Sequence, residues 1–246
     1  MAHVDRSFIG EAEIFARPFG TTGALQSIGN CDAFNIGYNV DSRKLPNYMG
    51  GGGNRNVSEK VSDVTVAIGM YDVTPENLAR VTKAAVSSYA AGIVSAEPIA
   101  CAGVEGELIP FKYLPDLTQP VTISTAGDVA LAEGQDYILG PHGIFPTSGS
   151  DITSAGIKAT YTRKAASVVE MLAGSQVELE LFVAGLNDAQ SGEPYALRAH
   201  RCKFGIVKEL GLIGTSYMKL DSQGELLADH RVTEVGISKF CKMDLM

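Results

Sequence analysis

Several carboxylates stand two residues apart, the spacing that places two side chains on the same face of a β-strand. Glu178 and Glu180 form one such pair, and Glu105 and Glu107 form another. Paired carboxylates act in glycoside hydrolases, about 5–5.5 Å apart in retaining enzymes and further apart in inverting ones. A solvated strand face explains the same spacing without any chemistry. We therefore assign neither pair a catalytic role.

Four consecutive glycines, Gly50–Gly53, invite comparison with a phosphate-binding loop. Such a loop requires the pattern GxxxxGK[ST] between a buried strand and a helix. Here the glycines are followed by Asn54–Asn56 and then by another strand pattern. The run therefore predicts a contact loop with a free backbone, and no phosphate or cofactor site.

The cysteines and histidines are scattered, and no CxxC pair occurs. A zinc site needs at least one pair of closely spaced ligands, and a nucleophilic serine of the hydrolase type needs a GxSxG turn. Neither pattern is present, so we expect four reduced, mostly buried thiols, no metal, no cofactor and no enzymatic activity. The residues concerned are Cys31, Cys101, Cys202, Cys241, His3, His142, His200 and His230.

The charge balance narrows the classes of partner. The 246 residues carry a formal net charge of −8, with 20 basic and 28 acidic side chains. Nucleic-acid-binding surfaces and polybasic membrane patches both need clustered Lys and Arg. No run approaches the roughly 18 apolar residues of a membrane-spanning helix. Acidic residues within Met1–Phe15 also argue against a secretion signal.

Two strands with one apolar and one polar face are predicted at Ala33–Val40 and Val61–Met70, because apolar residues alternate with polar ones. Pro46 and the glycine run lie between them, so we expect Lys44–Asn56 to be a long flexible loop. One helix is predicted from Pro75 to about Ser88, since Thr74 is a good N-cap and proline suits the first helical position.

The remaining chain is predicted to be mostly strand, arranged as a β-sandwich with one flanking helix. We expect a single domain over residues 1–246. Six of the ten prolines fall between Pro98 and Pro146. Because proline cannot donate to a sheet ladder, this region is predicted to be irregular, with a small β-rich insertion at about 116–152.

The order of segments between Gly29 and Val81 carries a family resemblance. Its parts are Gly29-Asn30-Cys31 opening a strand, Lys44-Leu45-Pro46-Asn47-Tyr48 leading into the glycine run, a strand ending at Met70-Tyr71-Asp72, and Thr74-Pro75-Glu76-Asn77-Leu78-Ala79. This layout of strand, long loop, strand and helix resembles the major tail tube protein of long-tailed (siphophage-type) bacteriophages. The resemblance covers about a fifth of the chain.

The resemblance implies a structural virion protein. In that family six copies form a ring whose inner strands join into one continuous barrel, and stacked rings conduct genome DNA into the host cell. The expected partners are further copies of the chain, the tape-measure, tail-tip and tail-terminator proteins, and passing double-stranded DNA, with no membrane. The protein would be assembled in the bacterial host cytoplasm and reside in the phage tail. The alternative is a soluble β-sandwich glycan-binding module or hydrolase domain.

The resemblance also suggests two sets of site residues. The polar face of the inner strands would line the channel, and by simple alternation it holds no Lys or Arg, so DNA would slide without sticking. Its predicted residues are Asn35, Asn39, Asp41, Glu59, Asp63 and Thr65. The contact with the next ring is expected at Leu45, Pro46, Asn47, Tyr48, Met49, Gly50, Gly51, Gly52, Gly53 and Asn54. Because six chains carry about −48 charges, we expect ring stacking to depend on shape and apolar contact.

Overall fold

Extended strands dominate the computed structural model, which describes residues 5–246. Strands account for 49% of the chain and helices for 5%. This confirms the predicted mainly β class, and residues 5–246 contain one α-helix, as expected. The sheets are antiparallel, and none closes into a barrel within residues 5–246.

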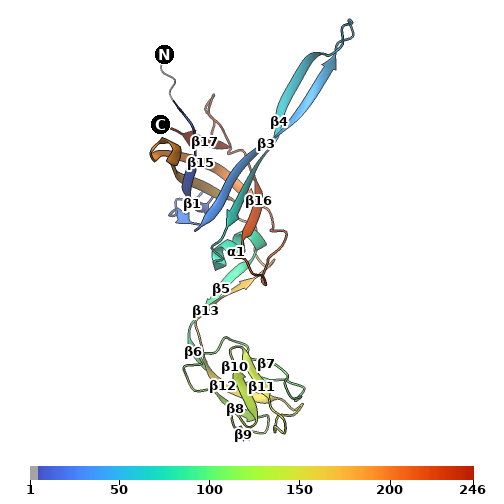
Figure 1. The fold of residues 1–246 in the computed structure, drawn as a ribbon, viewed down its shortest axis with the longest axis vertical. Coiled ribbons are helices and arrows are strands. Elements are labelled where there is room, and N and C mark those ends of the chain that lie inside the picture. The colour runs from blue at the N-terminus through green and yellow to red at the C-terminus, as the bar shows by residue number, and fades with distance from the viewer. Residues whose placement is uncertain (1–4) are drawn as a thin grey trace. The chain divides into compact units, whose positions relative to one another are not determined.

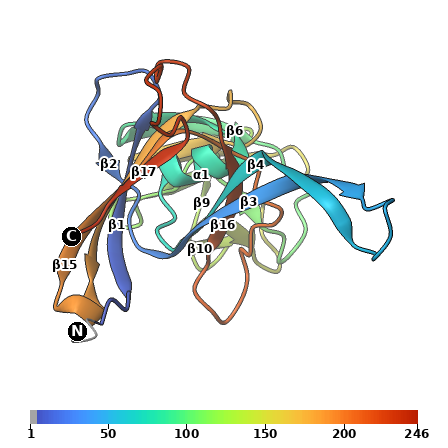
Figure 2. The same ribbon diagram turned by 90° about the horizontal axis from the view of Figure 1, so that it is seen from above.

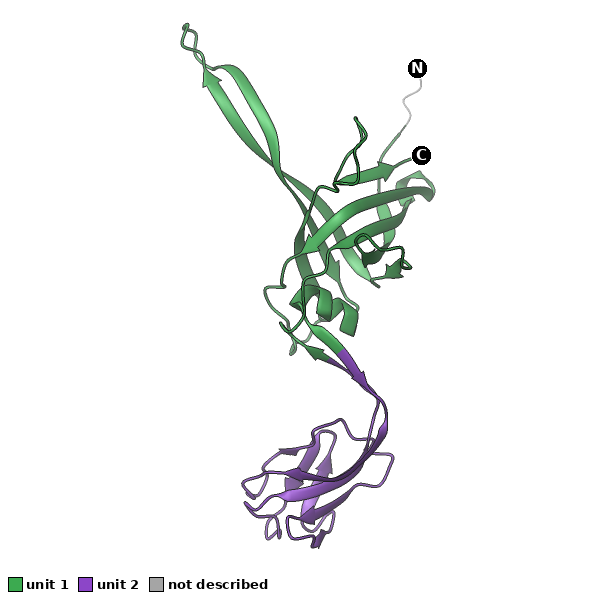
Figure 3. Ribbon diagram, turned by 180° about the vertical axis from the view of Figure 1, so that it is seen from behind, with its two compact units in different colours: residues 1–86, 169–246 green, residues 87–168 purple. Residues whose placement is uncertain are grey.

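The chain divides into two compact units, coloured separately in Figure 3. Unit 1 comprises residues 1–86 and 169–246, and unit 2 comprises residues 87–168. The segment 116–152, expected from the sequence as a β-rich insertion, lies inside unit 2. Each unit has its own hydrophobic core.

Unit 1 contains an eight-stranded sheet with the strand order β2-β1-β14-β15-β16-β4-β3. Strand β17 also pairs with β15, alongside Ala196–Ala199, while β16 pairs with β15 at Cys202–Phe204. Because β3 ends this order, its outer edge has no partner strand in the described part of the chain. The strands are β1 (Gly10–Pro18), β2 (Gln26–Ser27), β3 (Cys31–Pro46), β4 (Asn54–Met70), β14 (Leu179–Asn187), β15 (Glu193–Phe204), β16 (Leu220–Leu226) and β17 (Cys241–Asp244).

The core of unit 1 is built by the alternating inward residues of these strands. Ile14 of β1 and Leu181 of β14 belong to one cluster with Val66 of β4 and Leu220 of β16. Val81 of the helix is fully buried in the same cluster. The sequence pattern of β4 is explained by this packing, since Val64, Val66, Ile68 and Met70 are all buried.

The helix α1 (Pro75–Thr82) begins where the sequence predicts and ends earlier. The Thr74 side chain accepts a hydrogen bond from the Asn77 backbone N–H, 3.1 Å away. The expected continuation to Ser88 is wrong. Lys83 takes the left-handed conformation that ends a helix, and the chain then pairs as β5 (Ala85–Tyr89) with β13 (Ala166–Glu170). A short 3₁₀ helix, η1 (Asp188–Gln190), joins β14 to β15.

Unit 2 packs two small sheets around a separate core. Its buried residues include Ile109, Ile144, Ile157 and Tyr161. One sheet contains β6 (Gly92–Ile99), β12 (Ile157–Arg163), β8 (Thr122–Thr125) and β9 (Ala130–Leu131), and the other contains β10 (Tyr137–Gly140), β11 (Gly143–Pro146) and β7 (Ile109–Pro110).

Candidate assembly site

The candidate site is the hairpin formed by β3 and β4. The two strands pair along their whole length, from Cys31 opposite Met70 to Pro46 opposite Asn54. Figures 1 and 2 show the far part of this hairpin leaving the rest of unit 1. The expected long loop over Lys44–Asn56 is therefore wrong, because the ladder continues to Pro46 and leaves only residues 47–53 unpaired. Three of the predicted contact residues, Leu45, Pro46 and Asn54, belong to the strands.

The tip of the hairpin is a closed turn organised by Asn47. Its backbone N–H donates to the Gly53 carbonyl at 3.0 Å, and its side-chain amide donates to the Gly50 carbonyl at 2.6 Å. All four glycines of Gly50–Gly53 have φ between +71° and +91°, a region that glycine enters without steric cost. The turn presents Tyr48 and Met49, which are 84% and 82% exposed.

Burial changes abruptly along the hairpin. On β4 the alternating core residues end at Val64, and residues 54–63 are all exposed. On β3 residues 39–46 are likewise exposed. We call residues 39–63 the arm. The arm has no core of its own, so the paired backbones and the tip turn are what hold its shape.

A β-bulge at Ser62 changes which arm side chains share a face. Asn39 lies opposite Asp63, but Val40 lies opposite Val61, so Ser62 is an extra residue on β4. Its hydroxyl lies 3.2 Å from both the Asn39 carbonyl and the Asp63 carboxylate. One extra residue shifts the alternation by one position. The β4 side chains between Ser62 and the tip therefore lie on the face opposite to the one that strict alternation predicts.

The bulge corrects the predicted channel-facing set. Asn35, Asn39 and Asp41 of β3 share one face, which we call the polar face, with Asp63 and Thr65 of β4. Glu59 lies opposite Ser42 and therefore on the other face, so its placement with the rest was wrong. A strict alternation along β4 missed it, and nothing in the sequence indicates the extra residue.

The same shift brings basic residues onto the polar face. Lys60 lies opposite Asp41, and Arg43 of β3 is in phase with them. The expectation that no Lys or Arg shares this face is therefore wrong for the arm. The part of the face before the bulge, formed by Asn35, Gly37 and Asn39 with Asp63, Thr65 and Ala67, carries no basic side chain.

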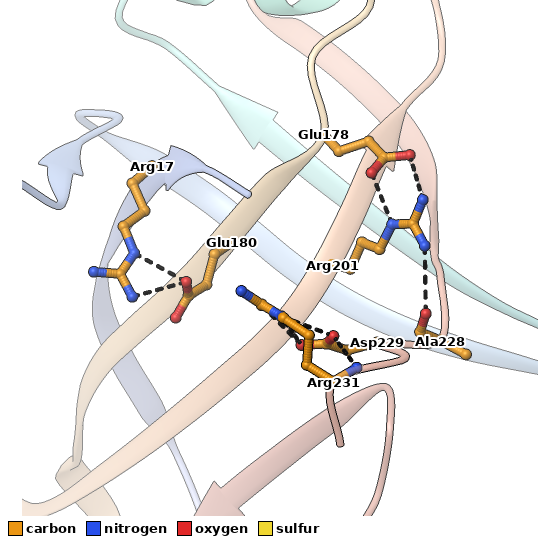
Figure 4. A network of polar contacts seen from close by, with 7 residues as sticks. All are labelled: Arg17, Glu178, Glu180, Arg201, Ala228, Asp229 and Arg231. Atoms are coloured by element: carbon orange, nitrogen blue, oxygen red, sulfur yellow. Dashed lines mark hydrogen bonds and ion pairs between the residues drawn. The ribbon is translucent and has the colours of Figure 1, made fainter. Parts of the chain in front are cut away.

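Glu178 and Glu180, the first carboxylate pair, are engaged in separate ion pairs (Figure 4). Both oxygens of Glu178 accept from Arg201, at 2.7 and 2.8 Å, and Glu180 accepts from Arg17 at 2.8 Å. The hydrogen bonds from Arg201 hold the pKa of Glu178 below its usual range. A carboxylate held in this way is a poor proton donor. The two ion pairs instead link neighbouring strands of the sheet.

In the second carboxylate pair, the Glu107 side chain caps a turn. The Glu107 side chain accepts from the backbone N–H groups of Ala102 and Gly103, at 2.9–3.0 Å. These hydrogen bonds, led by that from Ala102, lower the pKa of Glu107. The Glu107 side chain therefore stabilises the backbone conformation of residues 102–107.

All four cysteines are free thiols. Cys202 is buried, and the other three are half-buried. Burial raises the pKa of Cys202 to about 12, and burial together with Asp72 and Asp32 raises that of Cys31 to about 11. Thiols held in the neutral form are weak nucleophiles.

Two negative findings hold for residues 5–246. No group of three or more His, Cys, Asp or Glu side chains in this range is placed to hold a metal ion. No helix in this range has the length and apolar character needed to cross a bilayer.

The hairpin, the two cores and the ion pairs lie within one region of family similarity. A protein-family model described as "protein of unknown function UCP028589" matches residues 7–244. A search of curated proteins finds no match. Because the family model spans nearly all of both units, the chain belongs to the family of proteins of unknown function UCP028589.

Proposed function

We propose that this chain is the major subunit of the tail tube of a long-tailed bacteriophage, a structural protein without catalytic activity. In this proposal six copies close into a ring, rings stack into a tube, and the channel conducts genome DNA into the host cell. The observation that carries the proposal is the β3–β4 hairpin, which combines an unpaired sheet edge with an arm that nothing within residues 5–246 covers.

The open sheet supports the formation of a ring. The outer edge of β3 is unpaired in the described chain, and β2 covers β1 only at Phe15 and Ala16. Free edges attract further strands, and a barrel that closes across subunits removes them. In the proposed ring, sheets of neighbouring copies join along these edges.

The polar face before the bulge supports the channel. Its Asn35, Asn39, Asp63 and Thr65 side chains are polar or acidic, and no basic side chain shares that part of the face. These hairpin side chains offer phosphate groups no ion pair, so DNA would pass this part of the wall without binding to it. Asp41 lies one step further along the same face, opposite Lys60.

The arm supports the stacking of rings. Its tip presents Tyr48 and Met49, and Leu45 is 49% exposed on the strand that leads to them. Apolar and aromatic side chains of this kind act as anchors at protein interfaces. The proposed partners beyond further copies are the tape-measure, tail-tip and tail-terminator proteins, and the proposed location is the virion after assembly in the host cytoplasm.

Size-exclusion chromatography with negative-stain electron microscopy tests the proposal. The purified protein should form rings or tubes with a central channel, in amounts that rise with protein concentration. A persistent monomer at high concentration would contradict the proposal, and binding of a glycan by that monomer would favour the alternative module.

A variant with a shortened hairpin distinguishes the proposed contact within a ring from the proposed contact between rings. Replacing residues 41–60 by Asn-Gly joins Val40 to Val61, which already face each other across the ladder, through a turn that suits two-residue hairpins. The shortened protein should still fold and form single rings, but it should not form tubes. Tubes of normal length from this variant would show that the arm has no part in stacking.

A further inference from the structure

The β-bulge at Ser62 lies where the hairpin leaves the body of unit 1. Val64 is the last buried residue of β4 on the way to the tip, and residues 54–63 are all exposed. A bulge bends its strand and increases the local twist. The boundary between the covered and the uncovered part of the hairpin therefore coincides with a bend.

The extra residue is not needed to align the faces of the arm. The last pair before the bulge joins Asn39 to Asp63. The first pair after it joins Val40 to Val61. Without Ser62 these two pairs would follow each other directly, and every pair beyond them would keep its partner and its face. What Ser62 adds to the hairpin is therefore the bend and the twist alone.

Contacts within the hairpin hold the bulge in place. The Ser62 hydroxyl lies 3.2 Å from the Asn39 carbonyl oxygen and 3.2 Å from the Asp63 carboxylate. Only one residue interrupts the ladder, since paired residues lie directly on both sides of it. The arm is therefore joined to the body at a fixed angle, whereas a longer break in the pairing would leave a loose joint.

We infer that the Ser62 bulge sets the direction in which the arm leaves the body, and that the stacking of rings requires this direction. The inference rests on the proposed function, in which the inner part of β3 joins a neighbouring copy and the tip reaches the next ring. One hairpin then makes two contacts, and both form together only if the angle between its parts suits both partners. Because the arm has no core of its own, the bend in the ladder fixes that angle. Ser62 is accordingly a positioning residue.

Deletion of Ser62 from the full-length protein tests the inference. The deletion keeps every cross-strand pair, so the thermal unfolding of unit 1 should stay close to that of the wild type. Spin labels carried by non-natural amino acids at Tyr48 and Ala184, both exposed, report the distance from tip to body in the free subunit. This distance should shift by several ångströms. The protein concentration needed for tube formation, measured by pelleting and electron microscopy, should rise by about tenfold or more, while single rings still form.

Two further variants separate the bend from the loss of a residue. Ser62→Ala keeps the extra residue and loses only the hydroxyl, so the tip distance and tube formation should stay close to those of the wild type. Moving Ser62 to a place between Val57 and Ser58 keeps the length, the composition and all pairs of the chain, but places the bend nearer the tip. This moved-bulge variant should fail to form tubes, as the deletion does. Circular dichroism checks that each variant is folded, and the moved-bulge variant carries the test if the deletion is not.

The outcomes separate the inference from the proposed function. If the deletion or the moved-bulge variant forms tubes as readily as the wild type, the inference is overturned and the proposed function stands. An unchanged tip distance after the deletion has the same meaning. If the deletion variant forms irregular aggregates in place of rings, the bulge protects a free strand edge, and the inference is again overturned. If the wild-type protein forms no rings or tubes, the proposed function itself fails, and the inference fails with it.

Discussion

The inner and outer parts of the β3–β4 hairpin share the same two strands and the same ladder but differ in what they contact. The inner part of β4 buries four apolar side chains against β1, β14, β16 and the helix. The outer part, residues 39–63, is exposed on both faces apart from Asn47. An isolated two-stranded hairpin is only marginally stable in water. The outer part therefore gains stability only from its own strand pairing and tip turn, or from a partner.

Truncation of a core residue gives the sharpest contrast between the two parts. Ile68→Ala in the inner part should lower the free energy of unfolding of unit 1 by about 2–5 kcal/mol, because Ile68 is 2% exposed and leaves a cavity. Val61→Ala in the arm should change it by less than about 0.5 kcal/mol. Both changes in unfolding free energy are measured by denaturant unfolding, which is monitored through hydrogen exchange of the β4 and β16 amides. Equal losses would mean that the arm is packed in the free subunit.

The second prediction concerns the irregular segment around Asp229, which is held by side-chain contacts within residues 5–246. Asp229 is buried and accepts hydrogen bonds from the side chain and backbone N–H of Arg231, at 2.8–3.2 Å. Arg231 in turn lies 4.2 Å from the centre of the Phe19 ring. Asp229→Asn should cost about 1–3 kcal/mol of unfolding free energy at pH 7, since it weakens charged hydrogen bonds.

The contact between Asp229 and Arg231 also predicts how the stability of the fold depends on pH. The hydrogen bonds from Arg231 lower the pKa of Asp229 to about 2, below its ordinary value of 3.8. A lowered pKa stabilises the folded state above the unfolded pKa, and that stabilisation is lost as the pH falls from about 4 to about 2. The difference between wild type and Asp229→Asn should therefore shrink over this range in thermal unfolding experiments. A difference that stays constant down to pH 2 would show that the ion pair contributes nothing.

The smallest expected effect is at the tip. Gly51 has φ +84° with no atom within 4 Å of a Cβ added there, so Gly51→Ala meets no clash and only the backbone cost of about 1 kcal/mol. Hydrogen exchange of the Met49 and Gly53 amides should become faster while the unfolding of the body stays unchanged. Gly23→Ala is the matched control, because Gly23 has no positive φ and an added Cβ would meet only the Thr21 hydroxyl oxygen, at an ordinary contact distance of 3.8 Å. Unchanged exchange at the tip would contradict a closed turn.

Much of the body of unit 1 could be predicted from the sequence, because its strands each have one buried face. Alternation of apolar residues located the inner parts of β3 and β4, and Thr74 with Pro75 located the start of the helix. The end of the helix could not be predicted, because the residues after Lys83 pair with β13, which lies about eighty residues later in the chain. Such long-range pairing overrides local propensity.

The candidate site was predicted in outline only. The glycine run identifies the tip, but the exposed strands on either side carry no buried face, so their sequence predicts a loop. The phase of the arm depends on one extra residue, Ser62, whose effect is visible only in the pairing of the two strands. For that reason strict alternation predicts the wrong face for Glu59 and does not bring Lys60 and Arg43 onto the polar face.

The paired strands β5 and β13 have a consequence for protein engineering. Both points where the chain passes between the units lie within this one ribbon, and each unit keeps a separate core. A foreign domain whose two ends are adjacent could therefore replace residues 87–168 without rerouting any strand of the eight-stranded sheet. The β5–β13 ribbon is therefore a suitable insertion site for a foreign domain.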